Sequence, residues 1–95
     1  MNEASIFIII PAYNVGSLLD RCMQSVLAQT LTHIEILLIN DGSTNNITAE
    51  RCDYWGDKDD RVSVFHQQNQ GLAQTCNIGV KRTKGTFIGF VDSDD

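Results

Sequence analysis

Residues Ile34–Thr44 have the sequence IEILLINDGST, in which a short apolar segment runs directly into a polar turn. The segment Ile34–Ile39 is rich in Ile and Leu, which is typical of a strand that is buried on both faces of a sheet. Asn40 and Asp41 follow it, and Gly42 then permits a tight turn because it has no Cβ. A buried strand that ends in a polar turn is the pattern expected of an open parallel sheet, in which ligands bind where the strands end.

Three other short runs rich in Ile, Val or Phe lie along the chain, at Ile6–Ile10, Val62–Phe65 and Phe87–Val91. The segments between the runs have helical periodicity, with apolar residues spaced three or four apart. The residues expected to face the core are Leu18, Cys22 and Val26 with Leu19, Met23 and Leu27 in the first helix, Ile47, Cys52, Tyr54 and Trp55 in the second, and Leu72, Cys76 and Val80 in the third.

The predicted order of elements is therefore βαβαβαβ. Asn14 is expected to cap the first helix, the second is expected to start at Ser43 or Thr44, and the third near Gly71. Strands that are joined through helices are parallel, and their crossovers are almost always right-handed. We therefore expect an α/β fold, with a Rossmann-like parallel sheet of about four strands and helices on both faces.

The composition is that of one small globular domain, with 95 residues of which 42% are hydrophobic and 20% charged. These fractions exclude a disordered chain. The net charge of −5 argues against a nucleic-acid partner, because a phosphate backbone requires a basic surface. The longest purely apolar run, Ile6–Ile10, is far shorter than the roughly 20 residues of a membrane span. We therefore expect a cytoplasmic protein, with membrane contact only through further parts of a longer parent chain.

Cysteine usage agrees with a reducing compartment. Cys22, Cys52 and Cys76 are odd in number and widely spaced, and they form no C-x-x-C pair. A disulfide framework or a structural zinc site is not expected from this pattern, so the three residues are predicted to be reduced thiols.

Three carboxylates follow the last predicted strand, at Asp92, Asp94 and Asp95. Carboxylates this close repel one another unless a cation lies between them. Hard oxygen ligands suit Mg²⁺ or Mn²⁺, which usually bind one or two carboxylates together with substrate phosphates. If extended geometry continues past Val91, Asp92 and Asp94 lie on a similar side of the chain. The alternative is a solvated acidic segment.

The ends of the other strands carry polar groups whose role the sequence leaves open. The Asp41 carboxylate can accept hydrogen bonds from a base or a ribose, or it can cap a helix or form an Asx turn. Tyr13 can stack on a nucleobase or lie half-buried at the edge of the sheet. His66 is expected to be a structural hydrogen-bonding group. The sequence has no G-x-G-x-x-G after the first strand and no P-loop motif, which disfavours dinucleotide oxidoreductases and P-loop ATPases.

Several segments together resemble the opening of a family-two glycosyltransferase. They occur in the right order and spacing over essentially the whole chain, as Ile8–Asn14 (IIIPAYN), Ser25–Thr30 (SVLAQT), Glu35–Thr44 (EILLINDGST), Asn69–Leu72 (NQGL), the Asn77-x-Gly79 step and Gly85–Asp95 (GTFIGFVDSDD). The resemblance implies a GT-A fold and inverting transfer of a sugar from a nucleotide-diphosphate sugar, commonly a UDP-sugar. It makes residues 1–95 the N-terminal donor-binding portion of such a domain, truncated just after the D-x-D motif.

The resemblance also implies roles for particular residues. Asp41 would hydrogen-bond the base, and Asp92 would contact the ribose or the metal shell. Asp94, the second carboxylate of the D-x-D motif, would bind Mn²⁺ or Mg²⁺ that bridges the diphosphate and neutralises charge on the departing group. The residues that would line the nucleotide pocket, with Tyr13 against the base, are Pro11, Ala12, Tyr13 and Asn14.

Two features depart from the family pattern. Members usually carry an arginine just before the asparagine that corresponds to Asn77, where it contacts the nucleotide, whereas this sequence has Cys76, which cannot make a charge-assisted hydrogen bond. The resemblance also implies an acceptor site and a general base beyond Asp95, so no residue here is assigned as that base. A last strand with no following element leaves a sheet edge uncovered, which favours homo-oligomers.

Other functions stay open on the sequence alone. A non-catalytic nucleotide-binding or interaction module with the same fold is favoured in part by Cys76. A receiver-type signalling domain is also a small acidic α/β unit that binds Mg²⁺, but its acid pair should follow the first strand, where this sequence has Pro11–Tyr13. A nucleotidyltransferase would normally show a Gly-rich basic loop at that same place.

Overall fold

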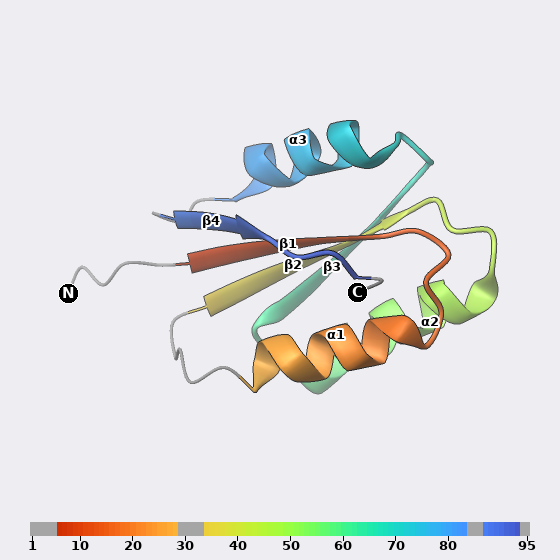
Figure 1. Cartoon of the computed structure of the whole chain (residues 1–95), viewed down its shortest axis with the longest axis horizontal. Coiled ribbons are helices and arrows are strands. Elements are labelled where there is room, and N and C mark those ends of the chain that lie inside the picture. Colours follow the sequence, from red (N-terminus) through yellow and green to blue (C-terminus); the bar gives the residue numbers. More distant parts are fainter. Residues whose placement is uncertain (1–5, 29–33, 84–86, 94–95) are drawn as a thin grey trace.

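The computed structural model describes residues 6–28, 34–83 and 87–93, and strands alternate with helices along this part of the chain (Figure 1). The alternation confirms the predicted order and the α/β class. The elements are β1 (Ile6–Ala12), α1 (Leu18–Leu27), β2 (Ile34–Asp41), α2 (Asn46–Lys58), β3 (Val62–Gln67), α3 (Leu72–Arg82) and β4 (Phe87–Phe90).

The strands of the described residues form one parallel sheet with the order β3-β2-β1-β4. β1 lies inside the sheet and pairs with β2 from Ile6 to Ala12 and with β4 from Ile6 to Ile9. The chain therefore moves outward from β1 to β3 and then returns to the other side of β1. Such a reversal of strand order opens a crevice at the carboxyl ends of the strands on either side of it, which is where ligands bind in open α/β sheets.

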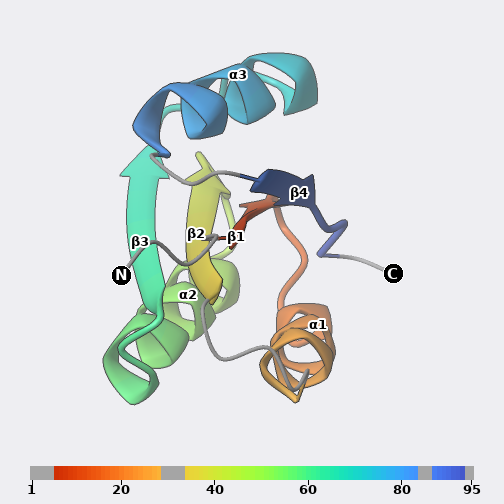
Figure 2. The same cartoon turned by 90° about the vertical axis from the view of Figure 1, so that its left-hand side faces the viewer.

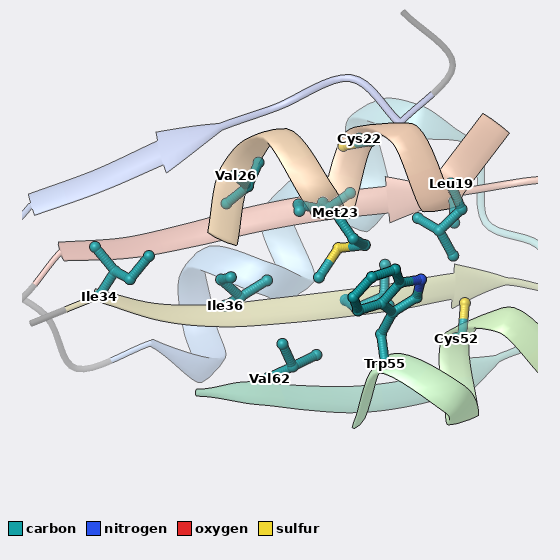
Figure 3. Packing of buried hydrophobic residues seen from close by; sticks show 12 residues of the cluster. Leu19, Cys22, Met23, Val26, Ile34, Ile36, Cys52, Trp55 and Val62 are labelled. Carbon is teal, nitrogen blue, oxygen red and sulfur yellow. The ribbon is translucent and has the colours of Figure 1, made fainter. Parts of the chain in front are cut away.

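The helices form one layer on each side of the sheet. Figure 2 shows α1 and α2 against one face and α3 against the other. Met23 of α1 and Trp55 of α2 meet over Ile36 of β2 in the centre of the main core (Figure 3), and all three side chains are at least 95% buried. Burying a large apolar side chain stabilises the fold by about 1.5–3 kcal/mol, so this layer accounts for much of the stability of the domain.

A partly buried polar contact joins α1 to α2 beside that core. The Asp20 carboxylate oxygen Oδ1 accepts hydrogen bonds from Trp55 Nε1 at 2.8 Å and from Arg51 Nε at 2.9 Å. A buried indole N–H needs a partner, so Asp20 satisfies the one polar group that Trp55 brings into the core.

Two helices begin at other residues than predicted, and several side chains that were expected to be buried are exposed. α1 begins at Leu18 after Ser17, and Asn14 does not cap it. α2 begins at Asn46, where the Asn45 side chain accepts a hydrogen bond from Thr48 N at 2.8 Å. The residues that were expected to be buried and are instead exposed are Leu18 (47%), Ile47 (56%), Tyr54 (41%), Leu72 (64%) and Val80 (42%).

The face of α3 that packs on the sheet carries small side chains. Thr75 is fully buried, and Gly79 lies against Ile9 of β1. A Cβ on Gly79 would lie 2.7 Å from Ile9 Cγ2 and 2.9 Å from Ile9 Cδ1, so only glycine allows this approach. The close approach turns the Leu72 and Val80 side of the helix away from the sheet, which is why the apolar spacing alone predicted the wrong face.

No helix in residues 6–28, 34–83 and 87–93 is both long enough and apolar enough to cross a membrane.

We predict that Gly79→Ala lowers the free energy of unfolding by about 1–2 kcal/mol, because overpacking against the fully buried Ile9 outweighs the higher helix propensity of alanine. Urea unfolding curves give the measurement. Gly89→Ala in β4 is the matched control, because a Cβ there has no heavy atom within 4 Å. Equal stability of the two variants would contradict the close contact between α3 and β1.

Candidate functional site

A pocket of about 380 Å³ lies at the carboxyl ends of the strands, on the β1–β4 side where the strand order reverses. It brings together four segments that are far apart in the sequence. The described residues that line it are Pro11, Ala12, Tyr13, Val15, Asp41, Asn69, Gly71, Leu72, Asp92 and Ser93. Both apolar surface and polar groups are therefore available to a ligand.

Five of the six residues predicted to bind a nucleotide line this one pocket: Pro11, Ala12, Tyr13, Asp41 and Asp92. The Tyr13 side chain is 48% exposed, so its ring is accessible at the end of β1. Asn14 is not among the lining residues of the described chain. Asp94, which was predicted together with Asp92 to bind the metal, lies outside the described residues, as does Asp95.

The segment that follows β4 is anchored to β1. Val91 N donates to Ile9 O at 3.1 Å, which continues the backbone pairing by one residue beyond β4. The Ser93 hydroxyl then donates to Pro11 O at 2.7 Å, and Ser93 is only 2% exposed. These two contacts fix Asp92, which lies between them and is exposed, at the edge of the pocket.

Cys76 of α3 lies within electrostatic reach of this acidic edge. Burial raises the pKa of the Cys76 thiol, and the negative charge of Asp92 raises it further. The thiol is therefore neutral at pH 7. Cys76 stands where the family pattern has an arginine, so this position contributes no positive charge beside Asp92.

Asn14 ties the segment after β1 to the segment after β2. Its backbone is in the left-handed region with a φ of 53°, which asparagine tolerates better than most residues. The side-chain oxygen accepts hydrogen bonds from Thr44 N at 2.8 Å and Asn45 N at 3.1 Å, and Nδ2 donates to Thr44 Oγ1 at 3.0 Å. Asn14 therefore supports the position of Tyr13 from outside the pocket.

Asp41 is 3% exposed, and its carboxylate accepts hydrogen bonds from within residues 67–71, which comprise the last residue of β3 and the link to α3 and are here called the 67–71 loop. Oδ1 accepts from Gln70 N at 2.7 Å and from Gln67 Nε2 at 2.9 Å. Oδ2 accepts from Gly71 N at 3.0 Å and from Asn69 Nδ2 at 3.2 Å. Gly71 is the N-cap of α3 and has no side chain of its own, so Asp41 supplies acceptors at that helix end.

His66 has a structural role, as predicted, and does not line the pocket. Its Nδ1 lies 3.0 Å from Asn40 Nδ2, and its Nε2 lies 2.8 Å from Asp53 Oδ1. Because Asn40 Oδ1 accepts from Ser43 N at 3.1 Å, the Asn40 amide is oriented with Nδ2 as the donor to the imidazole. The ring therefore links β3 to β2 and α2.

Five of the lining residues were not predicted from the sequence: Val15, Asn69, Gly71, Leu72 and Ser93. Asn69 and Gly71 belong to the polar segment after β3, and Leu72 starts α3. Ser93 lies between two aspartates of the predicted metal motif, and the alternation of an extended chain could have indicated that it points the other way from its neighbours. Gly42 also has a role there, because a Cβ at Gly42 would lie 2.4 Å from Asn69 N.

The residues of the pocket fit a divalent cation that is shared with a ligand. Asp92 offers one carboxylate at the pocket edge, and a Mg²⁺ or Mn²⁺ ion bound through one or two carboxylates, waters and phosphates needs no larger donor set. No group of three or more His, Cys, Asp or Glu residues that could hold a metal without a ligand occurs among the residues that the structure describes.

Comparison with known sequences gives a family. The sequence profile of the family described as "Glycosyl transferase family 2" matches residues 7–95. An uncharacterized glycosyltransferase of Bacillus subtilis, EpsJ, is 46% identical over 93% of this chain and 25% of its own length. The glycosyltransferase GlyG of Streptococcus pneumoniae is 46% identical over 95% of this chain and 30% of its own length. This chain therefore spans about a quarter to a third of these relatives.

Solved structures share the fold. The mannosyltransferase PcManGT from Pyrobaculum calidifontis, in complex with GDP-Man and Mn²⁺, superimposes with a TM-score of 0.87 at 17% identity, over 98% of this chain and 28% of that one. Staphylococcus aureus TarS 1–349, in complex with UDP, gives a TM-score of 0.83 at 26% identity, over 95% and 27%. The described strands and helices thus have the arrangement found in the N-terminal part of the GT-A fold, and the chain belongs to glycosyltransferase family 2.

Proposed function

We propose that this chain is the donor-binding part of an inverting glycosyltransferase and that its pocket takes a nucleotide-diphosphate sugar, with a UDP-sugar as the first candidate. The observation that carries the proposal is the pocket at the ends of β1 and β4, where Pro11–Tyr13 and Asp92 are held together. TarS 1–349 in complex with UDP is a neighbour of more than 25% identity, which supports a uridine nucleotide. The acceptor is left open.

Within the pocket, the exposed ring of Tyr13 offers an apolar face for the base. Stacking of a base on an aromatic side chain contributes about 1–3 kcal/mol and tolerates any base. Pro11 and Ala12 provide the floor at the end of β1, and Asn14 holds this segment in place through its bonds to the segment after β2. Asp41 forms part of the wall, together with Asn69 and Gly71.

We further propose that Asp92 and Asp94 hold Mn²⁺ or Mg²⁺ beside the diphosphate. The ion, when bound, would neutralise negative charge on the departing diphosphate as a Lewis acid. PcManGT, in complex with GDP-Man and Mn²⁺, shares the fold and supports this choice of metal. Ser93 contributes by fixing the chain between the two carboxylates through its hydrogen bond to Pro11 O.

A second candidate is a nucleotide-binding module without catalytic turnover. Cys76 favours it, because the neutral thiol stands where the family pattern places a cation. A radioactive transfer assay with the donor that binds, and with simple sugar acceptors or water, separates the two candidates. Release of UDP with transfer or hydrolysis of the sugar would favour the enzyme.

We predict that the protein binds UDP more tightly in the presence of MnCl₂ and that Asp92→Ala weakens this binding by about ten- to a hundredfold, because loss of a ligand lowers metal affinity. Isothermal titration calorimetry with and without the metal gives the measurement. Asp53→Ala is the control, because Asp53 is an exposed carboxylate on α2 outside the pocket. Metal-independent binding, or no binding by the folded wild-type protein, would contradict the proposal.

We also predict that Cys76→Arg binds UDP several-fold more tightly than the wild-type protein, because a guanidinium adds a charge-assisted hydrogen bond to a phosphate. The gain should shrink as salt is raised from about 0.05 to 0.5 M. Cys76→Ser, which stays neutral, should bind like the wild type. A variant carrying arginine that binds no better at low salt would show that this position does not reach the nucleotide.

A further inference from the structure

We propose that His66 is a positioning residue of the donor pocket, which acts through Asn40 and Ser43. These three residues form a chain of hydrogen bonds, here called the His66 relay, that ends at the peptide bond between Tyr13 and Asn14. The inference rests on the proposed function and deepens it, because Tyr13 lines the pocket and His66 acts on it from outside.

The tautomer of His66 follows from a backbone donor. Ser43 N can only donate, so the atom of the Asn40 side chain that lies 3.1 Å from it is the oxygen Oδ1. The other branch of the amide is then Nδ2, which donates to His66 Nδ1 at 3.0 Å. Because Nδ1 accepts, the proton of the neutral ring lies on Nε2, which donates to Asp53 Oδ1 at 2.8 Å. The neutral ring with its proton on Nε2 satisfies all three contacts.

Asn40 is the buried member of the His66 relay. It is 6% exposed and lies opposite His66 in the parallel pairing of β2 with β3. A buried amide nitrogen without an acceptor costs free energy, so the Asn40 side chain keeps this orientation only while His66 Nδ1 accepts from it. If that acceptor is removed, the amide turns toward another partner and Oδ1 moves away from Ser43 N. His66 therefore sets the orientation of Asn40 from the neighbouring strand.

Ser43 transmits this constraint to the segment after β1. Its hydroxyl oxygen accepts from Asn14 N at 3.0 Å, and this N–H belongs to the peptide bond that follows Tyr13. The next two backbone donors of the turn, Thr44 N and Asn45 N, bond Asn14 Oδ1 at 2.8 and 3.1 Å. These bonds lie at the surface, where water competes for them and each contributes little. The position of the turn therefore depends on the buried amide beneath it.

The contact of His66 with Asp53 lies on the other side of the ring and is not part of the His66 relay. The Asp53 carboxylate is on α2 and its side chain is 64% exposed, while that of His66 is 43% exposed. An exposed pair of this kind contributes little to stability. The two possible roles of His66 therefore use different nitrogens, Nδ1 for the relay and Nε2 for holding α2 to β3, and substitution can separate them.

Asparagine and glutamine each reproduce one nitrogen of the imidazole. In His66→Asn the amide oxygen takes the place of Nδ1, so the acceptor for Asn40 is kept and the donor to Asp53 is lost. In His66→Gln the amide nitrogen takes the place of Nε2, so the donor to Asp53 is kept and the acceptor for Asn40 is lost. If the His66 relay positions Tyr13, His66→Gln weakens nucleotide binding and His66→Asn does not. If His66 only holds α2 to β3, the order is reversed.

The experiment compares the wild-type protein with His66→Asn, His66→Gln, Ser43→Ala and the double variant Ser43→Ala/His66→Gln. Ser43→Ala removes the hydroxyl that accepts from Asn14 N and leaves the ring unchanged. Asp53→Ala is the control, because it removes the exposed partner of Nε2. Calorimetry with UDP and MnCl₂ gives the affinities. NMR on the nucleotide-free protein gives the nitrogen that carries the proton of the His66 ring and the hydrogen exchange of the Asn14 and Ser43 amides.

We expect His66→Gln and Ser43→Ala each to bind UDP about three- to tenfold more weakly than the wild-type protein, because each breaks one hydrogen bond of the same chain. The double variant should bind no more weakly than the more affected single variant, since residues that act in series are not additive. His66→Asn and Asp53→Ala should bind within about twofold of the wild type. The Asn14 and Ser43 amides should exchange faster in His66→Gln than in His66→Asn.

Equal affinities of the two His66 variants, a loss confined to His66→Asn, additive losses in the double variant, or a proton on Nδ1 of the wild-type ring would overturn the His66 relay. If His66→Gln does not fold, the other two single variants decide. Weak binding by Ser43→Ala together with normal binding by His66→Asn then supports the relay, and normal binding by Ser43→Ala overturns it. Faster amide exchange in His66→Gln, with no UDP binding by the folded wild-type protein, would overturn the proposed function and leave the relay standing.

Discussion

The parallel pairing of β1 with β2 on one side and with β4 on the other is the constraint on which the pocket depends. Because the chain leaves β1 in one direction and returns on its other side, the segments that follow the strands diverge there and leave a crevice. Backbone pairing of the segment after β4 with β1 ends at the hydrogen bond from Val91 N to Ile9 O. The hydrogen bond from Ser93 to Pro11 O anchors the rest of this segment, so that Asp92 lies at the same edge as Tyr13.

The other walls of the pocket are set by polar contacts and not by the apolar core. Asn14 joins the segments after β1 and β2, and Asp41 joins the end of β2 to the start of α3. The buried Asp41 carboxylate would be costly to bury without partners, and both Asn14 and Asp41 accept hydrogen bonds from two backbone N–H groups. The core beneath α1 and α2 lies on the far side of the sheet from α3 and gives the strands a stable base, while these side chains determine the shape of the site (Figures 2 and 3).

The order of the elements, the parallel sheet and the gathering of Pro11, Tyr13, Asp41 and Asp92 at one edge were predictable, because apolar runs and turn residues are local signals. The face of α3 was not predictable, since its Leu72 and Val80 spacing describes an apolar stripe that the helix turns outward. Glycine at position 79 sets the rotation of the helix through its contact with Ile9, and a small residue gives no hydrophobic signal in the sequence. The assignment of Asp94 to a metal stays a prediction.

The sequence by itself determined which chemical groups lie at the ends of the strands, because strand length and turn composition depend on residues that are adjacent in the sequence. Only the tertiary structure decided what those groups bond to. The partners of the Asp41 carboxylate lie 26 to 30 residues away along the chain, and which of its oxygens are filled depends on how closely the 67–71 loop packs on Gly42. The same holds for Cys76 and Asp92, which the packing of α3 on the sheet brings near each other, so that the charge of Asp92 acts through space on the Cys76 thiol.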